Sequence, residues 1–455
     1  MSSKYQPVIG LEVHVELYTK SKMFCACSAD YFGKEPNTHV CPVCLGLPGA
    51  LPYPNKQAIE WCVAIGLALN CQIPLFSKFD RKNYFYPDLP KGYQISQYDK
   101  PFCIKGQITL ANGKRIGITR VHMEEDTAKL THATVDGEKV SLIDFNRSGV
   151  PLVEIVTEPD FNSAQEVVEY LKKLQQIVRY LAVSSADMEK GDMRLEPNIS
   201  LQVTSNTKQE EKNVSRITSR VLPPYKVEVK NINSFRFVDR AIEYEIMRQS
   251  EILDRGETPT QETRGYSEAK NMTVSQRSKE EAHDYRYFPE PDIPPISWTD
   301  SQIKKMKDSL PELPDAKLVR FQKDYQLSPY DSQILTRGKD LSEYFEEAVR
   351  AGEEAKITPK QIANVIINKK PDINTILPAR LVQNIFAQTQ RVAVDENKLQ
   401  KIIEEVIAEN PKAIEDYKSG KENALMFLIG RVMRKIPQKL DANLVKEKIS
   451  KQIKQ

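Results

Sequence analysis

The stretch IGLEVHVEL, Ile9 to Leu17, alternates between aliphatic residues and residues that are small or ionisable. Because successive side chains of a strand point to opposite faces, the aliphatic residues share one face, and Glu12 and His14 share the other. The stretch therefore predicts a strand with one face packed on a core and one face that carries ionisable groups.

Patterns of this kind continue to about Pro295 and indicate mostly strands and loops. Further strands are expected at residues 117–123, 152–157, 199–203 and 225–229. Two helices interrupt them. The first follows the candidate N-caps Asn162 and Ser163, because the apolar residues up to Leu181 recur at helical spacing, and the second is expected at about 238–254.

The second part of the chain has a different sequence pattern. Prolines cluster from Pro289 to Pro295, and beyond Trp298 the sequence is polar and helical in pattern. We therefore predict an α+β protein. A large domain with a mixed sheet, residues 1–295, is followed by an all-helical domain, residues 296–395, and by a small helical C-terminal tail domain, residues 396–455.

The composition is that of an ordinary globular chain, with 40% hydrophobic and 28% charged residues. No apolar run approaches the roughly 18 residues that a membrane helix needs, and the first residues lack the features of an export signal. A cytoplasmic location is therefore expected. The net charge of +3 is uneven, because residues 411–455 hold eleven Lys or Arg and five Asp or Glu. A basic end favours docking of a polyanion, and a basic solvated helix face is the alternative.

The segment FDRKNYFYPDLPKGYQISQ, Phe79 to Gln97, is rich in basic and aromatic residues. Its prolines and glycine exclude a continuous helix or a central strand, so we expect a shaped loop. Positive charge beside flat rings suits the phosphates and bases of a single-stranded nucleic-acid end, whereas a rigid turn over a core edge is the alternative. The candidate binding residues are Arg81, Lys82, Tyr84, Tyr86, Lys91 and Tyr93.

Acidic residues and histidines form a second group of candidates. The first strand offers Glu12 and His14, and two other segments add His122, Glu124, Glu125, Asp126 and Glu154. Carboxylates with an imidazole suit a hard divalent cation, and Mg²⁺ in particular is held by one or two carboxylates with water and substrate phosphates. Exposed charges on a sheet edge are the alternative.

Seven cysteines in a chain without an export signal predict free thiols or metal ligands rather than disulfides. The pair Cys25 and Cys27 is separated by thirteen residues from the pair Cys41 and Cys44. Two close thiolate pairs joined by one loop are typical of a structural Zn²⁺ site, and reduced cysteines packed as small apolar groups are the alternative. The other three are expected in a core: Cys62, Cys71 and Cys103.

Most of the chain resembles the B subunit of the tRNA-dependent amidotransferases, the GatB family of the GatCAB complex. The hallmark stretch is NYFYPDLPKGYQISQ, which ends at Gln97. Seven further stretches match in one order: IGLEVHVEL from Ile9, CPVCLGLPGALP from Cys41, HMEEDTAKLTH from His122, DFNRSGVPLVEIVTEPD from Asp144, VEVKNINSFRFV from Val227, QETRGY from Gln261 and DYRYFPEPDIPP from Asp284. Matches of this length and order identify a family.

The resemblance implies a kinase-like cradle domain that uses ATP without a P-loop, followed by a helical domain and a tail domain. No G-x-x-x-x-G-K-[ST] loop occurs in this chain. The resemblance further implies a Mg²⁺ site, whose ligands would be Glu12, His14, Glu124 or Glu125, and Glu154. The implied catalytic residues are Glu12, His14, Glu125 and Glu154. Phosphate charge would come from Arg81, Lys82, Lys91, Arg147, Lys230 and Arg236.

The chain departs from the family pattern at residues 194–198. Where the family has Arg-Cys-Asp-x-Asn, this chain has Arg-Leu-Glu-Pro-Asn, so that Glu196 replaces the aspartate. Its extra methylene shifts the carboxylate, which leaves the role of Glu196 open. His283 and Asp284 could form a catalytic pair, although their place before a proline-rich turn favours a structural hydrogen bond.

The reaction that the resemblance implies is the repair of a mischarged tRNA. ATP phosphorylates the side-chain carboxylate of Glu on tRNA(Gln) or of Asp on tRNA(Asn), and ammonia then displaces phosphate to form the amide. The chain has no amidase motif and no nucleophile elbow. A glutaminase A subunit would therefore supply ammonia, with a small C subunit as the third partner. The alternatives are a non-catalytic tRNA-binding scaffold and a different metal-dependent phosphotransferase.

Overall fold

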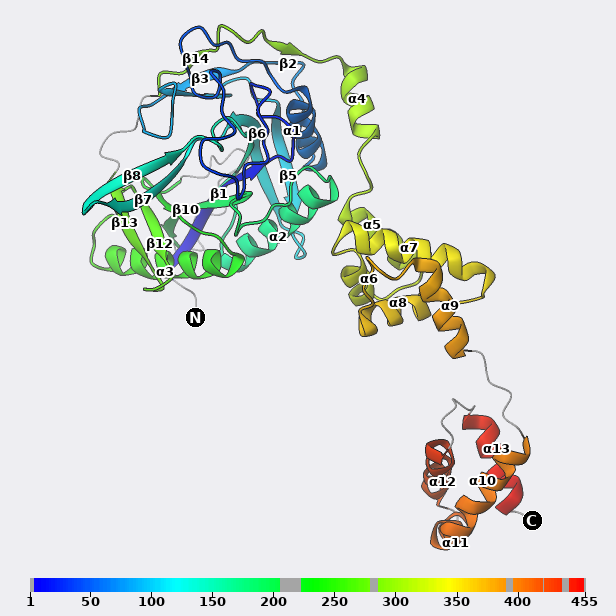
Figure 1. The fold of residues 1–455 in the computed structure, drawn as a ribbon. Coiled ribbons are helices and arrows are strands. Elements are labelled where there is room, and N and C mark those ends of the chain that lie inside the picture. Colours follow the sequence, from blue (N-terminus) through cyan, green and yellow to red (C-terminus); the bar gives the residue numbers. More distant parts are fainter. Residues whose placement is uncertain are drawn as a thin grey trace, which may run out of the picture. The chain divides into compact units, whose positions relative to one another are not determined.

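The computed structural model describes residues 4–204, 222–278, 285–389, 396–419, 421–435 and 442–453. The chain divides into two compact units (Figure 1). The first is sheet-rich and spans Met1–Leu318 with Arg337–Lys339, and the second is helical and spans Val319–Thr336 with Asp340–Gln455. The predicted α+β class is confirmed.

An eight-stranded mixed sheet forms the centre of the first unit, in the order β13-β12-β11-β10-β1-β9-β6-β5. Its strands are β1 (Tyr5–Glu16), β5 (Cys103–Thr109), β6 (Arg115–Glu125), β9 (Pro151–Thr157), β10 (Met193–Val203), β11 (Val227–Lys230), β12 (Glu262–Ser267) and β13 (Met272–Ser278). Among these described strands, the pair β11 and β12 is parallel and the other neighbours are antiparallel. The predicted strand at Ile9–Leu17 is β1, which lies inside the sheet between β9 and β10.

Three helices complete the hydrophobic core of this unit: α1 (Lys56–Ala68), α2 (Ala164–Tyr180) and α3 (Phe235–Asp254). Both helices that the sequence predicted are present as α2 and α3. Ser163 caps α2 by accepting a hydrogen bond from the Glu166 backbone N–H, as its sequence position predicted. The aliphatic face of β1 joins this core, and Ile9 and Val13 are fully buried there. The opposite face of β1 carries its ionisable side chains.

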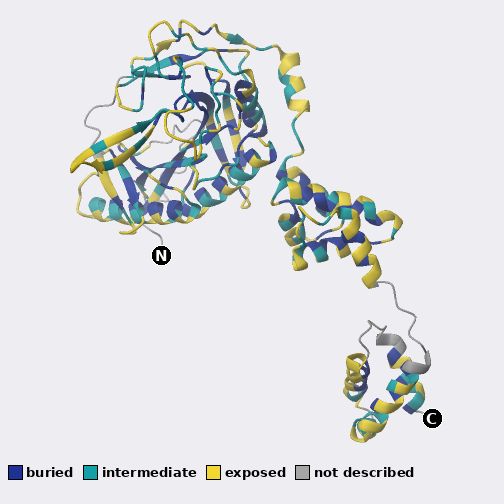
Figure 2. Ribbon diagram, viewed as in Figure 1, coloured by how far each residue is buried: buried dark blue, intermediate teal, exposed yellow. Residues whose placement is uncertain are grey.

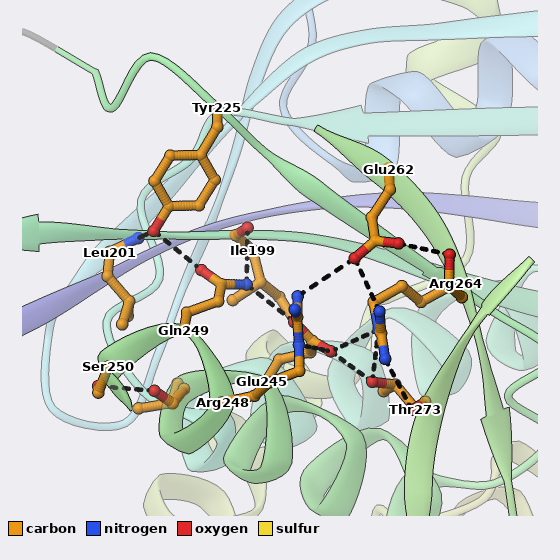
Figure 3. A network of polar contacts seen from close by, with 12 residues as sticks. Ile199, Leu201, Tyr225, Glu245, Arg248, Gln249, Ser250, Glu262, Arg264 and Thr273 are labelled. Atoms are coloured by element: carbon orange, nitrogen blue, oxygen red, sulfur yellow. Dashed lines mark hydrogen bonds and ion pairs between the residues drawn. The ribbon is translucent and has the colours of Figure 1, made fainter. Parts of the chain in front are cut away.

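A buried polar network connects α3 to the β12 and β13 end of the sheet (Figure 3). The carboxylate of Glu245, which is fully buried, lies 2.8 Å from Arg248 Nη2 and 3.1 Å from Arg264 Nε. The side chain of Gln249 donates to the same carboxylate, and its Oε1 accepts from the hydroxyl of Tyr225. Because each partner offsets the cost of burying the charge, the network fixes α3 on the sheet.

Smaller sheets surround the central one. One is built from β14 (Phe288–Pro289), β3 (Asp80–Asn83) and β4 (Tyr93–Ser96), a second from β15 (Ile296–Ser297) and β2 (Phe76–Ser77), and a third from the hairpin of β7 (Lys129–Val135) and β8 (Glu138–Asp144). The prediction of a loop throughout 79–97 is therefore wrong in part. Two short strands frame the turn at 84–92, because β3 pairs both with β4 and with the sequence-distant β14.

The remaining helices are α4 (Asp300–Asp308), α5 (Pro314–Asp324), α6 (Pro329–Leu335), α7 (Lys339–Glu354), α8 (Pro359–Lys369), α9 (Pro378–Thr389), α10 (Glu396–Glu409), α11 (Pro411–Lys418), α12 (Glu422–Lys435) and α13 (Ala442–Ile453). In the second unit, one hydrophobic cluster is centred on Phe321 and Phe345, and another on Ile403 and Leu428. Both lie on the inner faces of their helices (Figure 2). Within the described ranges, no helix has the length and apolar character needed to cross a bilayer.

Candidate active site

The polar face of the central sheet brings two histidines and a glutamate together from three adjacent strands. His14 on β1 lies opposite Glu154 on β9, and Glu154 lies opposite His122 on β6. The Nε2 atoms of His14 and His122 are 3.6 Å and 3.3 Å from Glu154 Oε2. The register of the sheet, rather than nearness in sequence, therefore builds this group.

Glu124 completes the group. It follows His122 by two residues on β6 and so points to the same face. Its carboxylate is 3.5 Å from His122 Nε2 and 3.6 Å from Lys82 Nζ, and it accepts hydrogen bonds from Ser96 and Gln94 on β4. One ligand atom each from His14, Glu124 and Glu154 lie within 4.8 Å of one another, which is close enough for one metal ion to bind all three. We call these three residues the histidine cluster.

Electrostatics in the histidine cluster favour ionised carboxylates. Burial raises the pKa of Glu124, but the positive charge of Lys82 together with the hydrogen bond and charge of His122 outweighs it and lowers that pKa to about 2. Burial lowers the pKa of His14, but the hydrogen bond and charge of Glu154 raise it to about 9. Lys82 and the histidines therefore neutralise the two carboxylates, in the place that a divalent cation would take.

A second group of carboxylates lies beside the first on the same face. Glu12 on β1 is opposite Glu196 on β10, and Glu228 comes from β11. Their oxygens lie within 4.8 Å of one another, and we call these three residues the carboxylate cluster. Lys230 Nζ is 3.2 Å from Glu196 and 3.6 Å from Glu228, and Asn198 Nδ2 donates to Glu12 at 3.0 Å.

The carboxylate cluster has the opposite electrostatic tendency. Burial raises the pKa of Glu12, and the negative charges of Glu154, Glu196 and Glu228 raise it further. Burial lowers the pKa of Lys230, but the charges of Glu196 and Glu228 outweigh it and raise that pKa. Lys230 is thus the cation of this cluster in the structure, whereas the family resemblance implied that it binds phosphate.

Glu125 lies outside both clusters. It is adjacent to Glu124 on β6, and its carboxylate is 2.6 Å from Lys91 Nζ and accepts from the backbone N–H of Ile95. The next residue, Asp126, pairs with Arg194 and lies 3.7 Å from Arg147 Nε. The predicted ligands therefore separate in space: His14 and Glu154 meet Glu124, Glu12 meets Glu196, and Glu125 pairs with a lysine.

The aromatic hairpin of β3 and β4 is built around Arg81. Its guanidinium binds Glu290 through two hydrogen bonds of 2.6 and 2.8 Å and lies 4.4 Å from the centre of the Tyr93 ring. Tyr84 packs edge-to-face on Tyr285. Arg81, Tyr84 and Tyr93 therefore have structural partners within the hairpin and its neighbours.

The most exposed ring of the hairpin is Phe85, which the sequence analysis did not select. Its side chain is 93% exposed, and that of Tyr86, which was selected, is 57% exposed. Its exposure could have been expected from the sequence, because Phe85 lies two residues before Pro87, where the turn-forming residues begin. Exposed rings of this kind are suited to stacking on bases.

The four predicted zinc ligands form one cluster. The sulfurs of Cys25, Cys27, Cys41 and Cys44 lie within 4.8 Å of one another, so this donor set fits a tetrahedral Zn²⁺ ion. The hydrogen bond from Cys25 lowers the pKa of Cys44 to about 4, and the same hydrogen bond raises the pKa of Cys25, so that of these two sulfurs Cys44 is the thiolate when no metal is bound. Cys62, Cys71 and Cys103 are buried free thiols in the core, as predicted.

The cysteine loop packs against the lysine of the Glu125 pair. Gly46 has a φ of +65°, and a Cβ there would lie 2.5 Å from Lys91 Cγ. The hydroxyl of Ser148 donates to the carbonyl of Cys44. The thiol cluster is therefore in contact with residues that lie beside the histidine cluster.

The last candidates lie elsewhere. Arg236 is an exposed residue of α3, 4.0 Å from Glu268 and next to the Phe237 ring. His283 and Asp284 fall outside the described residues. In the tail, Arg431 and Arg434 are exposed on α12.

Comparison with known families identifies the class. The family model described as the GatB/GatE catalytic domain matches residues 7–304, and the model described as the GatB domain matches residues 343–453. The chain belongs to the GatB/GatE family, as its sequence motifs predicted. The first match covers the central sheet and both clusters.

Full-length relatives narrow the comparison to one kind of protein. The chain is 44% identical to the aspartyl/glutamyl-tRNA(Asn/Gln) amidotransferase B subunit of Thermoanaerobacter pseudethanolicus, over 98% of this chain and 100% of that protein. It is 46% identical to the protein of the same name from Thermomicrobium roseum, over 95% of each chain. With the one from Thermotoga maritima the identity is 43%, over 98% of this chain and 99% of the relative.

Proposed function

We propose that this chain is the B subunit of a tRNA-dependent amidotransferase and performs its ATP-dependent step. The side-chain carboxylate of Glu on tRNA(Gln), of Asp on tRNA(Asn), or of both would be phosphorylated here and then converted to the amide. The observation that carries the proposal is the histidine cluster, which places His14, Glu124 and Glu154 from three strands around one point. A tRNA-binding scaffold has no need for this convergence of buried ionisable groups.

The donor set of the histidine cluster fits a divalent cation bound by two carboxylates and an imidazole. When Mg²⁺ is bound there, it neutralises charge on the transferred phosphoryl group. Glu124 and Glu154 are ionised and can hold the cation, and His14 can ligate once it has lost its proton. His122 stays beside both carboxylates and orients them.

Lys82 is the phosphate-binding residue that the geometry supports best. Its ammonium group is near Glu124, so it faces the point where a cation-bound phosphate would lie. Burial lowers the pKa of Lys82, but Glu124 together with Tyr287, Glu154 and Tyr84 outweighs it and raises that pKa, so the group stays positively charged. Lys91 and Arg147, by contrast, already pair with Glu125 and Asp126 and are proposed to orient the loops around the site.

Ammonia is proposed to come from glutamine through partner subunits. The chain has no amidase motif, so a glutaminase A subunit and a small C subunit complete the proposed complex. The basic tail would bind the tRNA body through its phosphates, and Phe85 with Tyr86 would lie near the acceptor end. Such a complex would act in the cytoplasm. The partition into domains of residues 1–295, 296–395 and 396–455 stays part of the proposal.

The cysteine cluster is proposed to hold a structural Zn²⁺ ion. The test is metal analysis of the purified full-length chain. We expect one zinc per chain in the wild type and its loss in Cys44→Ser, whereas Cys62→Ala, which alters a buried thiol outside the cluster, retains it. Zinc-free wild-type protein with unchanged thermal stability would contradict a structural metal.

The function is tested by amidation assays of the three-subunit complex with both mischarged tRNAs, ATP and Mg²⁺. His14→Ala and Glu124→Ala are expected to abolish amidation while glutaminase activity and tRNA binding are retained. That result would place the ATP-dependent step in this chain. Full amidation by both variants would contradict the proposal and favour the scaffold.

A further inference from the structure

A lysine with a fully buried side chain lies beside the cysteine cluster. Lys22 has no exposed surface, and it precedes Cys25 by three residues. Its ammonium group donates to the carbonyl of His39 at 2.8 Å and to the carbonyl of Phe145 at 3.2 Å. Among the residues that the structure describes, no carboxylate forms an ion pair with Lys22. The buried ammonium group is therefore held by carbonyl oxygens and has no carboxylate to balance its charge.

An ammonium group in such a position is costly. Removing a charge from water costs more free energy than hydrogen bonds to neutral carbonyls offset, so buried charges are as a rule paired. Two other lysines with mostly buried side chains follow this rule, because Lys82 lies near Glu124 and Lys91 pairs with Glu125. Lys22 therefore needs a negative charge from another source.

The cysteine cluster can supply that negative charge. A Cβ atom at Gly149 would lie 3.6 Å from Cys44 Cβ and 3.6 Å from Lys22 Cδ, so these two side chains border the same small space. The hydrogen bond from Cys25 is the largest influence on the pKa of Cys44, and the positive charge of Lys22 lowers that pKa further. The ammonium group is thus close enough to the sulfurs to stabilise their negative charge.

The zinc-bound form of the cluster needs a cation in its turn. Four thiolates carry two negative charges more than one Zn²⁺ ion neutralises. A site with a net negative charge in the interior of a protein has the same desolvation cost as any other buried ion. The charges of Lys22 and of the zinc-bound cluster are therefore opposite, and each offsets the cost of burying the other.

Lys22 also connects the two segments that provide the thiolate pairs. Its backbone N–H donates to the carbonyl of Cys27 at 2.9 Å. Its ammonium group binds the carbonyl of His39, which precedes Cys41 by two residues. These bonds fix the ammonium group beside both halves of the cysteine loop.

We propose that Lys22 is the buried counter-charge of the cysteine cluster, and that its ammonium group balances part of the negative charge of the four thiolates when Zn²⁺ is bound. The inference rests on the proposed structural zinc. It assigns a role to a lysine that the ATP-dependent step does not use. If the role is electrostatic, the affinity for zinc must depend on the charge at this position.

The test is the affinity of the full-length chain for Zn²⁺, measured by competition with a chelator that changes colour when it binds the metal. Lys22→Met removes the charge and keeps an unbranched side chain, and we expect the dissociation constant of Zn²⁺ to rise about tenfold or more. Lys20→Met is the matched control, because Lys20 is exposed and its replacement changes the net charge by the same amount. This control should bind zinc as the wild type does.

A neutral donor separates charge from hydrogen bonding. Lys22→Gln keeps an N–H donor at this position without the charge, and it should weaken zinc binding as Lys22→Met does. It also provides the measurement if circular dichroism shows that Lys22→Met does not fold. Wild-type zinc affinity of Lys22→Gln would overturn the proposal, because hydrogen bonding alone would then explain the role of Lys22.

A change of ligand tests the electrostatic role a second time. In Cys27→His, a neutral imidazole replaces the thiolate of a half-buried ligand, so the site keeps four ligands and loses one negative charge. In this background, the substitution Lys22→Met should raise the dissociation constant of Zn²⁺ by a smaller factor than in the wild-type background. Equal factors in the two backgrounds would overturn the proposal.

The outcomes distinguish this role from the zinc site itself. A wild-type chain that binds no zinc would contradict the proposed structural metal, and the role of Lys22 with it. A wild-type chain that binds zinc, together with unchanged zinc affinity in Lys22→Met and Lys22→Gln, would overturn the role of Lys22 and leave the structural metal standing.

Discussion

The two clusters on β1 differ in one respect that decides their chemistry. The histidine cluster combines two carboxylates with an imidazole and is faced by Lys82, and burial does not prevent Glu124 from being ionised. The carboxylate cluster has three carboxylates and Lys230, and the pKa of Glu12 is raised. The carboxylates of the two neighbouring sites therefore have opposite protonation tendencies, and the ionised carboxylates of the histidine cluster are the ones suited to a cation.

This difference arises from the register of the sheet. Glu12 and His14 are two residues apart and share a face, yet His14 lies opposite Glu154, whereas Glu12 lies opposite Val156 on β9 and Glu196 on β10. A register shift of two residues on β9 would place Glu12 opposite Glu154 and His14 opposite Leu152. The sequence motif thus specifies the ligands, and strand pairing specifies which of them meet.

The largest expected effect separates the clusters by activity. Glu154→Gln removes the carboxylate that contacts both histidines, and we expect amidation to fall about 100-fold or more because a ligand of the catalytic cation is lost. Glu228→Gln is the matched control in the carboxylate cluster and should cost less. The measurement is kcat for amidation by the three-subunit complex. Equal losses in the two variants would remove the distinction between the clusters.

A second prediction concerns stability and pH in the presence of EDTA. The pKa of His14 is raised from 6.5 to about 9 by Glu154, so the charged imidazole stabilises the fold. The contribution, at most about 3 kcal/mol, is complete below pH 6.5 and is lost as the pH rises through 9. Urea denaturation between pH 6 and 10 should show this loss in the wild type.

The controls for this experiment are two histidine variants. His14→Gln should remove the pH-dependent contribution, whereas replacement of the exposed His132 on β7 by glutamine should retain it. A pH profile of His14→Gln that matches the wild type would show that Glu154 does not stabilise the charged form of His14.

A third prediction compares the two lysines. Lys82 lowers the pKa of Glu124, so Lys82→Met should raise that pKa and move the acid limb of the activity profile to higher pH, by about one pH unit. Lys230→Met alters the carboxylate cluster and should leave the acid limb in place. The measurement is amidation as a function of pH for the wild type and the two variants. A shift of the acid limb in Lys230→Met alone would contradict the conclusion that Lys82 lowers the pKa of Glu124.

The smallest expected effect concerns the support of the carboxylate cluster. The hydroxyl of Thr263 on β12 donates to Glu228 at 2.7 Å in a buried position. Thr263→Val should lower the free energy of unfolding by about 1 kcal/mol. Thr119→Val, which removes a hydrogen bond of the same length to Glu158 at an exposed position, should cost less. Equal costs would mean that burial adds nothing to this hydrogen bond.

Local sequence patterns were sufficient to predict several elements of the fold and the site. The alternation at 9–17 predicted β1 and its polar face, and the apolar spacing after Ser163 predicted α2 with its cap. The cysteine spacing predicted a cluster that the fold assembles. Each of these depends on residues that are close together in the chain, or on a donor set with few alternatives.

The features of the site that could not be predicted from the sequence depend on pairing between strands that are distant in the chain. The choice between Glu124 and Glu125 depends on which face of β6 turns toward His14, and the sequence analysis did not resolve it. The roles of Gln94 and Ser96, which donate to Glu124, depend on β4 packing beside β6. These are ordinary polar residues of a short strand, so no local signal marks them.

The most direct test of the account is the location of the catalytic cation. Crystals of the complex soaked in Mn²⁺, as a substitute for Mg²⁺, would give an anomalous signal at the metal. We predict a peak about 2.1 Å from ligand atoms of His14, Glu124 and Glu154. A peak at Glu12, Glu196 and Glu228 instead, with none at the histidine cluster, would contradict the account.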